Sequence, residues 1–143
     1  MTMKVKEPKF TYQSVLLIDD NDLDNFINQK VIESAYFAKD VYMNTSARSA
    51  IEFLENLMKT SVGEELLPEV LFVDINMPVM DGFQFVSYFE EKLLSGLKRV
   101  PEIVILTSSL SPTDEERSKN CGVKVHFLRK PLTVEMLKGI SGV

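Results

Sequence analysis

The sequence predicts an α/β protein, with a doubly wound five-stranded parallel sheet and helices on both faces. Short apolar runs alternate five times with stretches of helical period, which gives a (βα)5 pattern. Such alternation with short connections favours right-handed crossovers and a parallel sheet. The runs VLLI, VLFV and IVIL are apolar at both parities, as strands buried on both faces are, so they are predicted to form the middle of the sheet. A chain of 143 residues, 45% of them hydrophobic, suffices for one such domain.

The first half of the chain supplies two strand–helix units. The apolar run Val15–Asp19 precedes a helix predicted from apolar residues at helical spacing, which are Leu23, Phe26, Ile27, Val31 and Ala35. A weaker run, VYMN at 41–44, precedes a second helix, whose apolar face consists of Ala47, Ala50, Ile51, Leu54, Leu57 and Met58. A polar connection at 60–68 closes this unit.

The second half supplies three more units. The run VLFVD at 70–74 precedes a helix whose inward residues are predicted to be Phe83, Val86, Phe89 and Leu93. The run IVILT at 103–107 is followed by a short polar helix, and VKVHFL at 123–128 alternates in polarity as an edge strand does. Thr133 is predicted to cap a last short helix, which carries Met136, Leu137 and Ile140.

Charge and composition limit the possible functions. The formal net charge of -5 argues against direct nucleic-acid binding, which usually needs a clustered basic face. The first residues lack the apolar core of a signal peptide, and no apolar run approaches the ~18 residues of a membrane span. The single cysteine, Cys121, permits no internal disulfide and is consistent with a reducing compartment. We therefore predict a cytoplasmic protein that is not attached to a membrane.

Polar side chains follow the inner strands at their carboxyl ends, where an open sheet of this kind binds its ligands. In chain order they are Asp19, Asp20, Asp74, Asn76, Thr107, Ser108, Lys130 and Pro131. Carboxylates that lie close together raise one another's pKa unless a cation joins them, and the candidate cations are Lys130 and a divalent metal. An all-oxygen ligand set suits Mg²⁺. His126, in the middle of a strand, is interpreted as an ordinary half-buried or surface histidine rather than a ligand.

Each of these residues also has an ordinary structural explanation. Asp20 or Asp22 is suited to cap the first helix, and Asp81, just before Gly82, to cap the third. Thr107 can satisfy backbone groups at the end of a strand, and a lysine in a loop is usually solvated. These explanations do not account for five such residues gathered at the same end of the sheet.

Four spaced motifs, VLLIDDN, VDINMPVMDG, ILTSS and FLRKP, resemble those of the receiver domain of two-component response regulators. The resemblance covers essentially the whole chain. It implies the flavodoxin-like strand order 2-1-3-4-5. It also implies a domain at 14–143, preceded by an N-terminal extension at 1–13. Such a domain is a signalling protein, which catalyses only its own phosphorylation and dephosphorylation.

The resemblance implies a role for each matching acidic residue. Asp74 resembles the phosphoacceptor. The Mg²⁺ ligands are expected to be Asp20, Asp74 and the backbone carbonyl of Asn76, with Asp19 holding the ion through water. A carboxylate at the tip of a strand is held rigidly and remains accessible, so it can attack a phosphoryl group in line.

Four further residues match the remainder of the family pattern. Thr107 resembles the switch hydroxyl that bonds one phosphoryl oxygen, and Lys130 resembles the lysine that pairs with another. Pro131 resembles the proline that follows this lysine through a cis bond. Phe127 occupies the position of the switch aromatic, which is tyrosine in many members, so the hydroxyl of that tyrosine is missing here.

The resemblance implies a sensor histidine kinase or a histidine phosphotransfer protein as the phosphodonor, and a downstream protein target. The segment SPTDEERSKNCG, with Ser111 at a cap position and Pro112 at the first helical position, has almost no apolar residue to anchor it. We expect a weakly held helix there, and a readout surface formed by this helix, the fifth strand and the last helix. The chain is interpreted as a single-domain regulator, with a receiver excised from a larger protein as the alternative. Monomer and phosphorylation-linked dimer both remain open.

Other classes of protein fit the sequence less well. A phosphatase of the haloacid-dehalogenase type needs a second acid two residues after Asp74, where this chain has Asn76. A flavin-binding carrier of the same fold needs a hydroxyl- and glycine-rich loop after the first strand, where DDNDLDN repels phosphate. The P-loop motif is absent from the sequence. A degenerate receiver that binds its partners without phosphorylation remains the alternative from the class of interaction modules.

Overall fold

The sheet has the strand order β2-β1-β3-β4-β5, and each neighbouring pair is parallel. The computed structural model describes residues 8–60, 63–108 and 111–141. Its strands are β1 Tyr12–Ile18, β2 Ala38–Asn44, β3 Val70–Asp74, β4 Glu102–Thr107 and β5 Val125–Arg129. The predicted order 2-1-3-4-5 is therefore confirmed. Because β1 begins at Tyr12, the last two residues of the predicted extension form part of the sheet, while residues 1–7 of that extension lie outside the described ranges.

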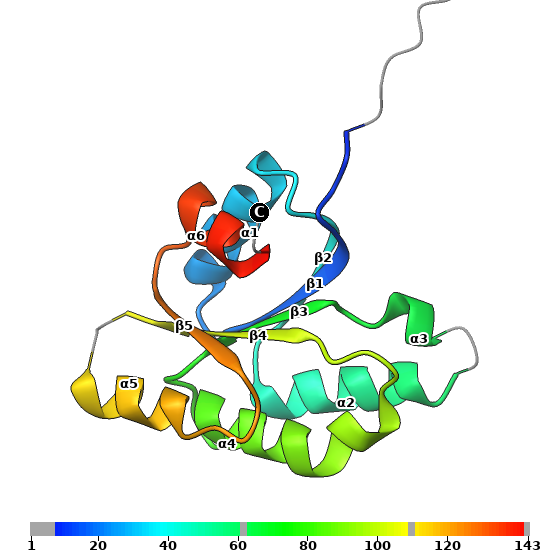
Figure 1. Ribbon diagram of the computed structural model, residues 1–143, viewed down its shortest axis with the longest axis vertical. Helices are drawn as coiled ribbons and strands as arrows, with labels where there is room; N and C mark the ends of the chain where they lie inside the picture. The colour runs from blue at the N-terminus through cyan, green and yellow to red at the C-terminus, as the bar shows by residue number, and fades with distance from the viewer. Residues whose placement is uncertain (1–7, 61–62, 109–110, 142–143) are drawn as a thin grey trace, which may run out of the picture.

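Helices cover both faces of the sheet, as predicted (Figure 1). Helices α1 (Asp22–Ser34) and α6 (Val134–Ser141) lie on one face. The opposite face carries α2 (Ala47–Met58), α4 (Gly82–Tyr88) and α5 (Pro112–Lys119). The polar connection at 60–68 contains a short helix, α3 (Gly63–Leu66), that the sequence pattern did not predict. None of the helices in the described ranges has the length and apolar character needed to cross a membrane.

The sheet separates two apolar cores, because alternate side chains of each strand point to opposite faces. On the α2/α4 side the core includes Leu16, Ile18, Leu71, Val73, Ile103 and Ile105 from the strands. On the α1/α6 side it includes Val15, Leu17, Val70, Phe72, Val104 and Leu106. Strand β3 is buried along its whole length, whereas β5 is half-buried to exposed, which confirms β5 as an edge strand.

The third predicted helix has the buried face expected of it, but it changes geometry partway. Phe83, Val86, Phe89 and Leu93 are all buried, as predicted. The α-helical part ends at Tyr88, and the chain continues as a π-helical turn at Phe89–Leu93 and a 3₁₀ turn at Leu94–Gly96.

Helix α1 forms where predicted, but the first half of its apolar stripe faces outward. Leu23, Phe26 and Ile27 are exposed, and the buried residues of the helix are Asn25, Asn28 and Ile32. An amphipathic helix normally buries its apolar stripe. Here side-chain hydrogen bonds orient the helix instead, because two asparagines on the inner face bond backbone groups of the neighbouring loops.

The helix caps correct one prediction and confirm two. The first helix is capped by Asn21, whose side chain accepts a hydrogen bond from the amide of Asp24, so neither Asp20 nor Asp22 is the cap. Asp81 caps α4 in a reciprocal capping box with Gln84. Thr133 Oγ1 accepts from the amide of Met136 at 3.2 Å, as expected of a cap on α6.

Candidate phosphoryl-acceptor site at the carboxyl ends of the strands

Three carboxylates converge where β1 and β3 end. Asp19 and Asp20 follow β1, and Asp74 is the last residue of β3. Each offers an oxygen within 4.8 Å of those of the other two. Asp19 and Asp74 are buried, at 3% and 4% exposure, while Asp20 is exposed. Because the strands are parallel and adjacent, their ends meet at one edge and bring the three acids together.

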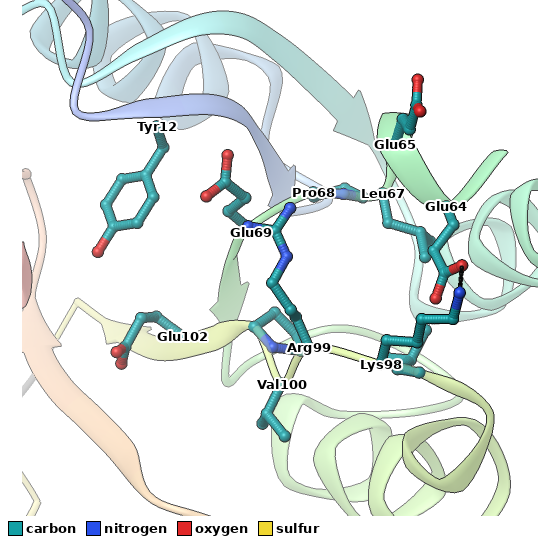
Figure 2. A pocket seen from close by; sticks show the side chains of 12 residues that line it. Tyr12, Glu64, Glu65, Leu67, Pro68, Glu69, Lys98, Arg99, Val100 and Glu102 are labelled. Atoms are coloured by element: carbon teal, nitrogen blue, oxygen red, sulfur yellow. Dashed lines mark ion pairs between the residues drawn. The ribbon is translucent and has the colours of Figure 1, made fainter. Parts of the chain in front are cut away.

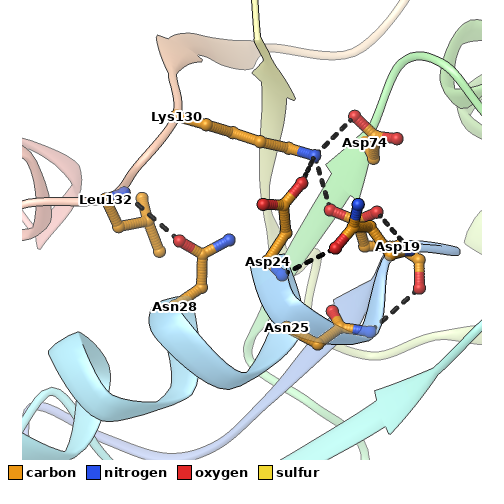
Figure 3. A network of polar contacts seen from close by, with 8 residues as sticks. Asp19, Asp24, Asn25, Asn28, Asp74, Lys130 and Leu132 are labelled. Atoms are coloured by element: carbon orange, nitrogen blue, oxygen red, sulfur yellow. Dashed lines mark hydrogen bonds and ion pairs between the residues drawn. The ribbon is translucent and has the colours of Figure 1, made fainter.

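Lys130 reaches into this acidic cluster from the end of β5. Its Nζ lies 2.6 Å from Asp19 Oδ2 and 3.0 Å from Asp74 Oδ1 (Figure 3). A third carboxylate, that of Asp24 on α1, lies 2.9 Å from the same nitrogen. Asp24 was not predicted from the sequence, although it belongs to the same acidic segment, DDNDLD, as Asp19 and Asp20.

The loop after β5 holds Lys130 in place. The amide of Lys130 donates to the carbonyl of Thr107 at 2.8 Å, which ties the loop to the end of β4. The peptide bond between Lys130 and Pro131 is cis. The amide of the next residue, Leu132, donates to Asn28 Oδ1 on α1 at 3.2 Å. The backbone around Lys130 is therefore held by β5, by the end of β4 and by α1, and this fixes the origin of the lysine side chain.

Helix α1 is also fastened to the loop that carries Asp19. The side-chain nitrogen of Asn25 donates to the carbonyl of Asp19 at 2.9 Å, in a buried bond. The amide of Asn21 donates to Asp19 Oδ1, also at 2.9 Å. The two bonds fix both the backbone and the carboxylate of Asp19 (Figure 3).

The charges of the cluster shift the protonation of its members. The pKa of Asp74 is raised to about 6, mainly by burial and in smaller part by the nearby carboxylates of Asp19 and Asp20, while Lys130 acts in the opposite direction. Burial alone would lower the pKa of Lys130, but its hydrogen bonds to Asp19, Asp24 and Asp74 outweigh burial and raise it. Lys130 therefore remains a cation, and Asp74 is mostly ionised at neutral pH.

The loop after β3 passes close to the phosphoacceptor candidate. Asn76 is exposed there, two residues after Asp74. The amide of Gly82 donates to the carbonyl of Ile75 at 2.9 Å. A Cβ atom at Gly82 would lie 2.5 Å from the carbonyl oxygen of Asp74, so the close return of the chain needs glycine at this position.

The two predicted switch residues lie on adjacent strands beside the acidic cluster. Thr107 is fully buried at the end of β4, one residue beyond Leu106, which pairs with Asp74. Phe127 pairs with Ile105 and is half-buried against the α2/α4-side core, three residues before Lys130. The structure thus brings Asp19, Asp20, Asp74 and Lys130 together, with Thr107 at the end of β4 and Phe127 earlier in β5.

His126 lies away from this cluster, toward the opposite end of the sheet. It is half-buried, and its Nε2 lies 2.9 Å from Glu102 Oε2, as expected of an ordinary histidine with a polar partner.

At that end of the sheet a hollow of about 650 Å³ lies between the starts of the strands, and Tyr12, Glu69, Lys98 and Arg99 are among the residues that line it (Figure 2). The pKa of Tyr12 is raised by burial and by the carboxylates of Glu102 and Glu69. Ligands of open α/β sheets bind at the other edge, so we assign this hollow no role.

Comparisons with known proteins agree with this geometry. A family model described as the response regulator receiver domain matches residues 15–140. The chain belongs to this family. A two-component response regulator from Cytophaga hutchinsonii is 29% identical with a TM-score of 0.81, and the match covers 91% of this receiver domain and 94% of that chain. The chemotaxis protein CheY4 of Vibrio cholerae is 28% identical with a TM-score of 0.68, covering 92% of this chain and 98% of the other.

Receiver domains also occur inside longer proteins. The sensor histidine kinase CheAY of Helicobacter pylori is 30% identical over 86% of this receiver domain, which spans 14% of the length of that protein. Receiver domains are signalling modules rather than metabolic enzymes, and they generally bind Mg²⁺ in an acidic pocket. The oxygen-only set of Asp19, Asp20 and Asp74 fits such an ion, because Mg²⁺ prefers a few carboxylates and completes its shell with water and phosphate oxygens.

Proposed function

We propose that this receiver domain accepts a phosphoryl group on Asp74 from a histidine kinase or a histidine phosphotransfer protein, with Mg²⁺ bound. The observation that carries the proposal is a buried carboxylate at a strand end, 3.0 Å from a lysine ammonium and next to two further carboxylates. That arrangement combines a fixed nucleophile with the charges that phosphoryl transfer requires.

Asp74 acts as the nucleophile in this scheme. One carboxylate oxygen attacks the phosphorus atom, and the bond between phosphorus and the donor's imidazole nitrogen breaks. The electron pair stays on the imidazole, so an acyl phosphate forms on Asp74. Since the pKa of Asp74 is about 6, the attacking carboxylate is mostly ionised at neutral pH.

Lys130 and the acidic set divide the task of balancing charge. Lys130 stays protonated and donates a hydrogen bond to a phosphoryl oxygen. Asp19, Asp20 and the backbone carbonyl of Asn76 would hold Mg²⁺ together with Asp74. When bound, the ion neutralises the charge that develops on the transferring oxygens. The same groups would serve when water later removes the phosphoryl group.

We further propose that Thr107 and Phe127 pass the change to the surface formed by α5, β5 and α6. Phosphorylation adds roughly -1.5 to -2 charge and three acceptor oxygens beside Thr107. Its hydroxyl then bonds one of those oxygens and draws the loop after β4 inward. A half-buried Phe127 on the neighbouring strand can follow this movement, and α5 carries a single buried residue, Ser118, among those described.

The test is intact mass after incubation with Mg²⁺ and acetyl phosphate. We expect a gain of one phosphoryl group in the wild-type protein and no gain in Asp74→Asn or when the metal is chelated. Asp40→Asn, a change at an exposed position on β2, serves as the matched control and should phosphorylate normally. If the wild-type protein gains no mass and does not bind Mg²⁺, it is instead a phosphate-independent binding module.

A further inference from the structure

Asp24 brings a fourth carboxylate to the site, and the chemistry proposed above gives it no role. It lies in the first turn of α1, and its Oδ2 is 2.9 Å from Lys130 Nζ. That distance is comparable with the 3.0 Å between Lys130 and Asp74 itself. An acid in the first turn of a helix usually acts on the helix N-terminus, so its position over Lys130 requires an explanation.

Capping of α1 does not explain where the Asp24 carboxylate points. In the usual capping box, an acid at this third position accepts a hydrogen bond from the N-cap amide. Here the N-cap amide, that of Asn21, donates to Asp19 Oδ1 instead, at 2.9 Å. The Asn21 side chain accepts from the amide of Asp24 at 3.0 Å, so the helix is capped without the Asp24 carboxylate.

Lys130 has no free donor to offer a phosphoryl group. A lysine ammonium carries three N–H donors, and the carboxylates of Asp19, Asp24 and Asp74 occupy all three. A phosphoryl oxygen on Asp74 can therefore bond Lys130 only if one of these contacts is released. The side chain of Asp19 is 4% exposed, whereas that of Asp24 is 33% exposed. Water can solvate Asp24 after its release far better than it can solvate Asp19.

We propose that Asp24 is a positioning residue that competes with the phosphoryl group for Lys130. Its carboxylate holds the ammonium in the unphosphorylated protein and gives it up when Asp74 is modified. The free energy of the Asp24–Lys130 contact is then lost from the phosphorylated state, which makes that state less favourable. This inference rests on the proposed function, because it requires a phosphoryl group on Asp74.

The experiment measures the binding of beryllofluoride, BeF₃⁻, which mimics a phosphoryl group on a carboxylate. Dissociation constants for Mg²⁺ alone, and for BeF₃⁻ at saturating Mg²⁺, are measured by titration calorimetry for the wild-type protein and for Asp24→Ala. Asp22→Ala is the matched control, because Asp22 is an exposed acid in the same helical turn and its loss removes the same charge. Circular dichroism verifies that both variants are folded.

We expect Asp24→Ala to bind BeF₃⁻ about three- to tenfold more tightly than Asp22→Ala, as loss of a partly exposed charged hydrogen bond predicts. The Mg²⁺ affinities of the two variants should be similar, because both lose one negative charge near the ion. Equal BeF₃⁻ affinities, or weaker binding by Asp24→Ala, would overturn the inference while leaving Asp74 as the acceptor. Failure of the proposed function looks different, since the wild-type protein itself would then not bind BeF₃⁻.

Discussion

Helices α1 and α5 both start near the acidic site, but they are attached to the protein in different ways. Helix α1 is joined to the backbone of the loops of the site by the side chains of Asn25 and Asn28. Helix α5 has one buried residue, Ser118, whose hydroxyl donates within the helix to the carbonyl of Glu115. The Arg117 guanidinium also lies 4.2 Å from the ring centroid of Phe83 on α4.

This difference indicates which side of the site can respond to a change of charge. A helix held by directional bonds to buried backbone groups moves only if those bonds break. A helix with few buried contacts opens at low free energy and is easily biased. The same event at Asp74 should therefore leave α1 in place and alter α5.

The largest expected effect comes from removing the buried carboxylate of Asp74, whose charge is disfavoured by burial and by the neighbouring acids. Its pKa is about 6 in the folded protein, against the ordinary aspartate value of 3.8 in the unfolded chain, so folding favours its protonated form. The stabilising contribution of that form is complete below pH 4 and is lost as the pH rises through 6. In chelator, the wild-type unfolding free energy should fall across this range by on the order of 2 to 3 kcal/mol more than that of Asp74→Asn.

Urea denaturation at several pH values provides the measurement, and added Mg²⁺ at pH 7 should restore the loss in the wild-type protein. Groups elsewhere titrate alike in both proteins and cancel in the difference. Identical pH profiles would mean that burial and the neighbouring carboxylates do not raise the pKa of Asp74. The charge at Asp74 would then give no reason for α5 to respond differently from α1.

A smaller effect distinguishes the attachments of the two helices directly. Asn28→Ala leaves the buried amide of Leu132 without its partner, and we expect a loss of about 1 to 3 kcal/mol in unfolding free energy. Ser118→Ala removes a bond inside α5 and should cost less than about 1 kcal/mol. Urea denaturation of both variants makes the comparison. An equal loss in the two variants would contradict the view that α1 is the more firmly held.

The smallest expected effect is a change in amide exchange on phosphorylation. Amides at 113–121 should change their exchange rates by about fivefold when Asp74 is phosphorylated, while those within α1 stay unchanged. Hydrogen exchange followed by mass spectrometry measures both helices in one experiment, with Asp74→Asn under the same conditions as the control. Unaltered protection at 113–121 would remove α5 from the proposed readout surface.

The fold follows from the sequence where apolar runs decide it. VLLI, VLFV and IVIL locate β1, β3 and β4, because a strand buried on both faces must be apolar at both parities. Polar residues that end such strands then locate the site. The short helix α3 and the π-helical turn after α4 have no comparable signal, since neither has a period of its own in the sequence.

What the sequence could not reveal depends on hydrogen bonds between distant residues. The buried face of α1 contains Asn25 and Asn28, whose partners are backbone groups of Asp19 and Leu132. Apolar periodicity contains no information about such bonds, so it selected the wrong face for the start of this helix. Asp24 was missed for the same reason, because its partner, Lys130, lies 106 residues away in the chain.

The outward stripe of Leu23, Phe26 and Ile27 has a consequence for how this domain can diverge. In most amphipathic helices the apolar residues are constrained by the core, so a change in their identity endangers folding. In α1 the core constraint falls on Asn25, Asn28 and Ile32 instead. Substitutions at the exposed positions can therefore change the surface of α1 while the protein keeps its stability. Related proteins can then bind different partners through this surface and still share the same fold.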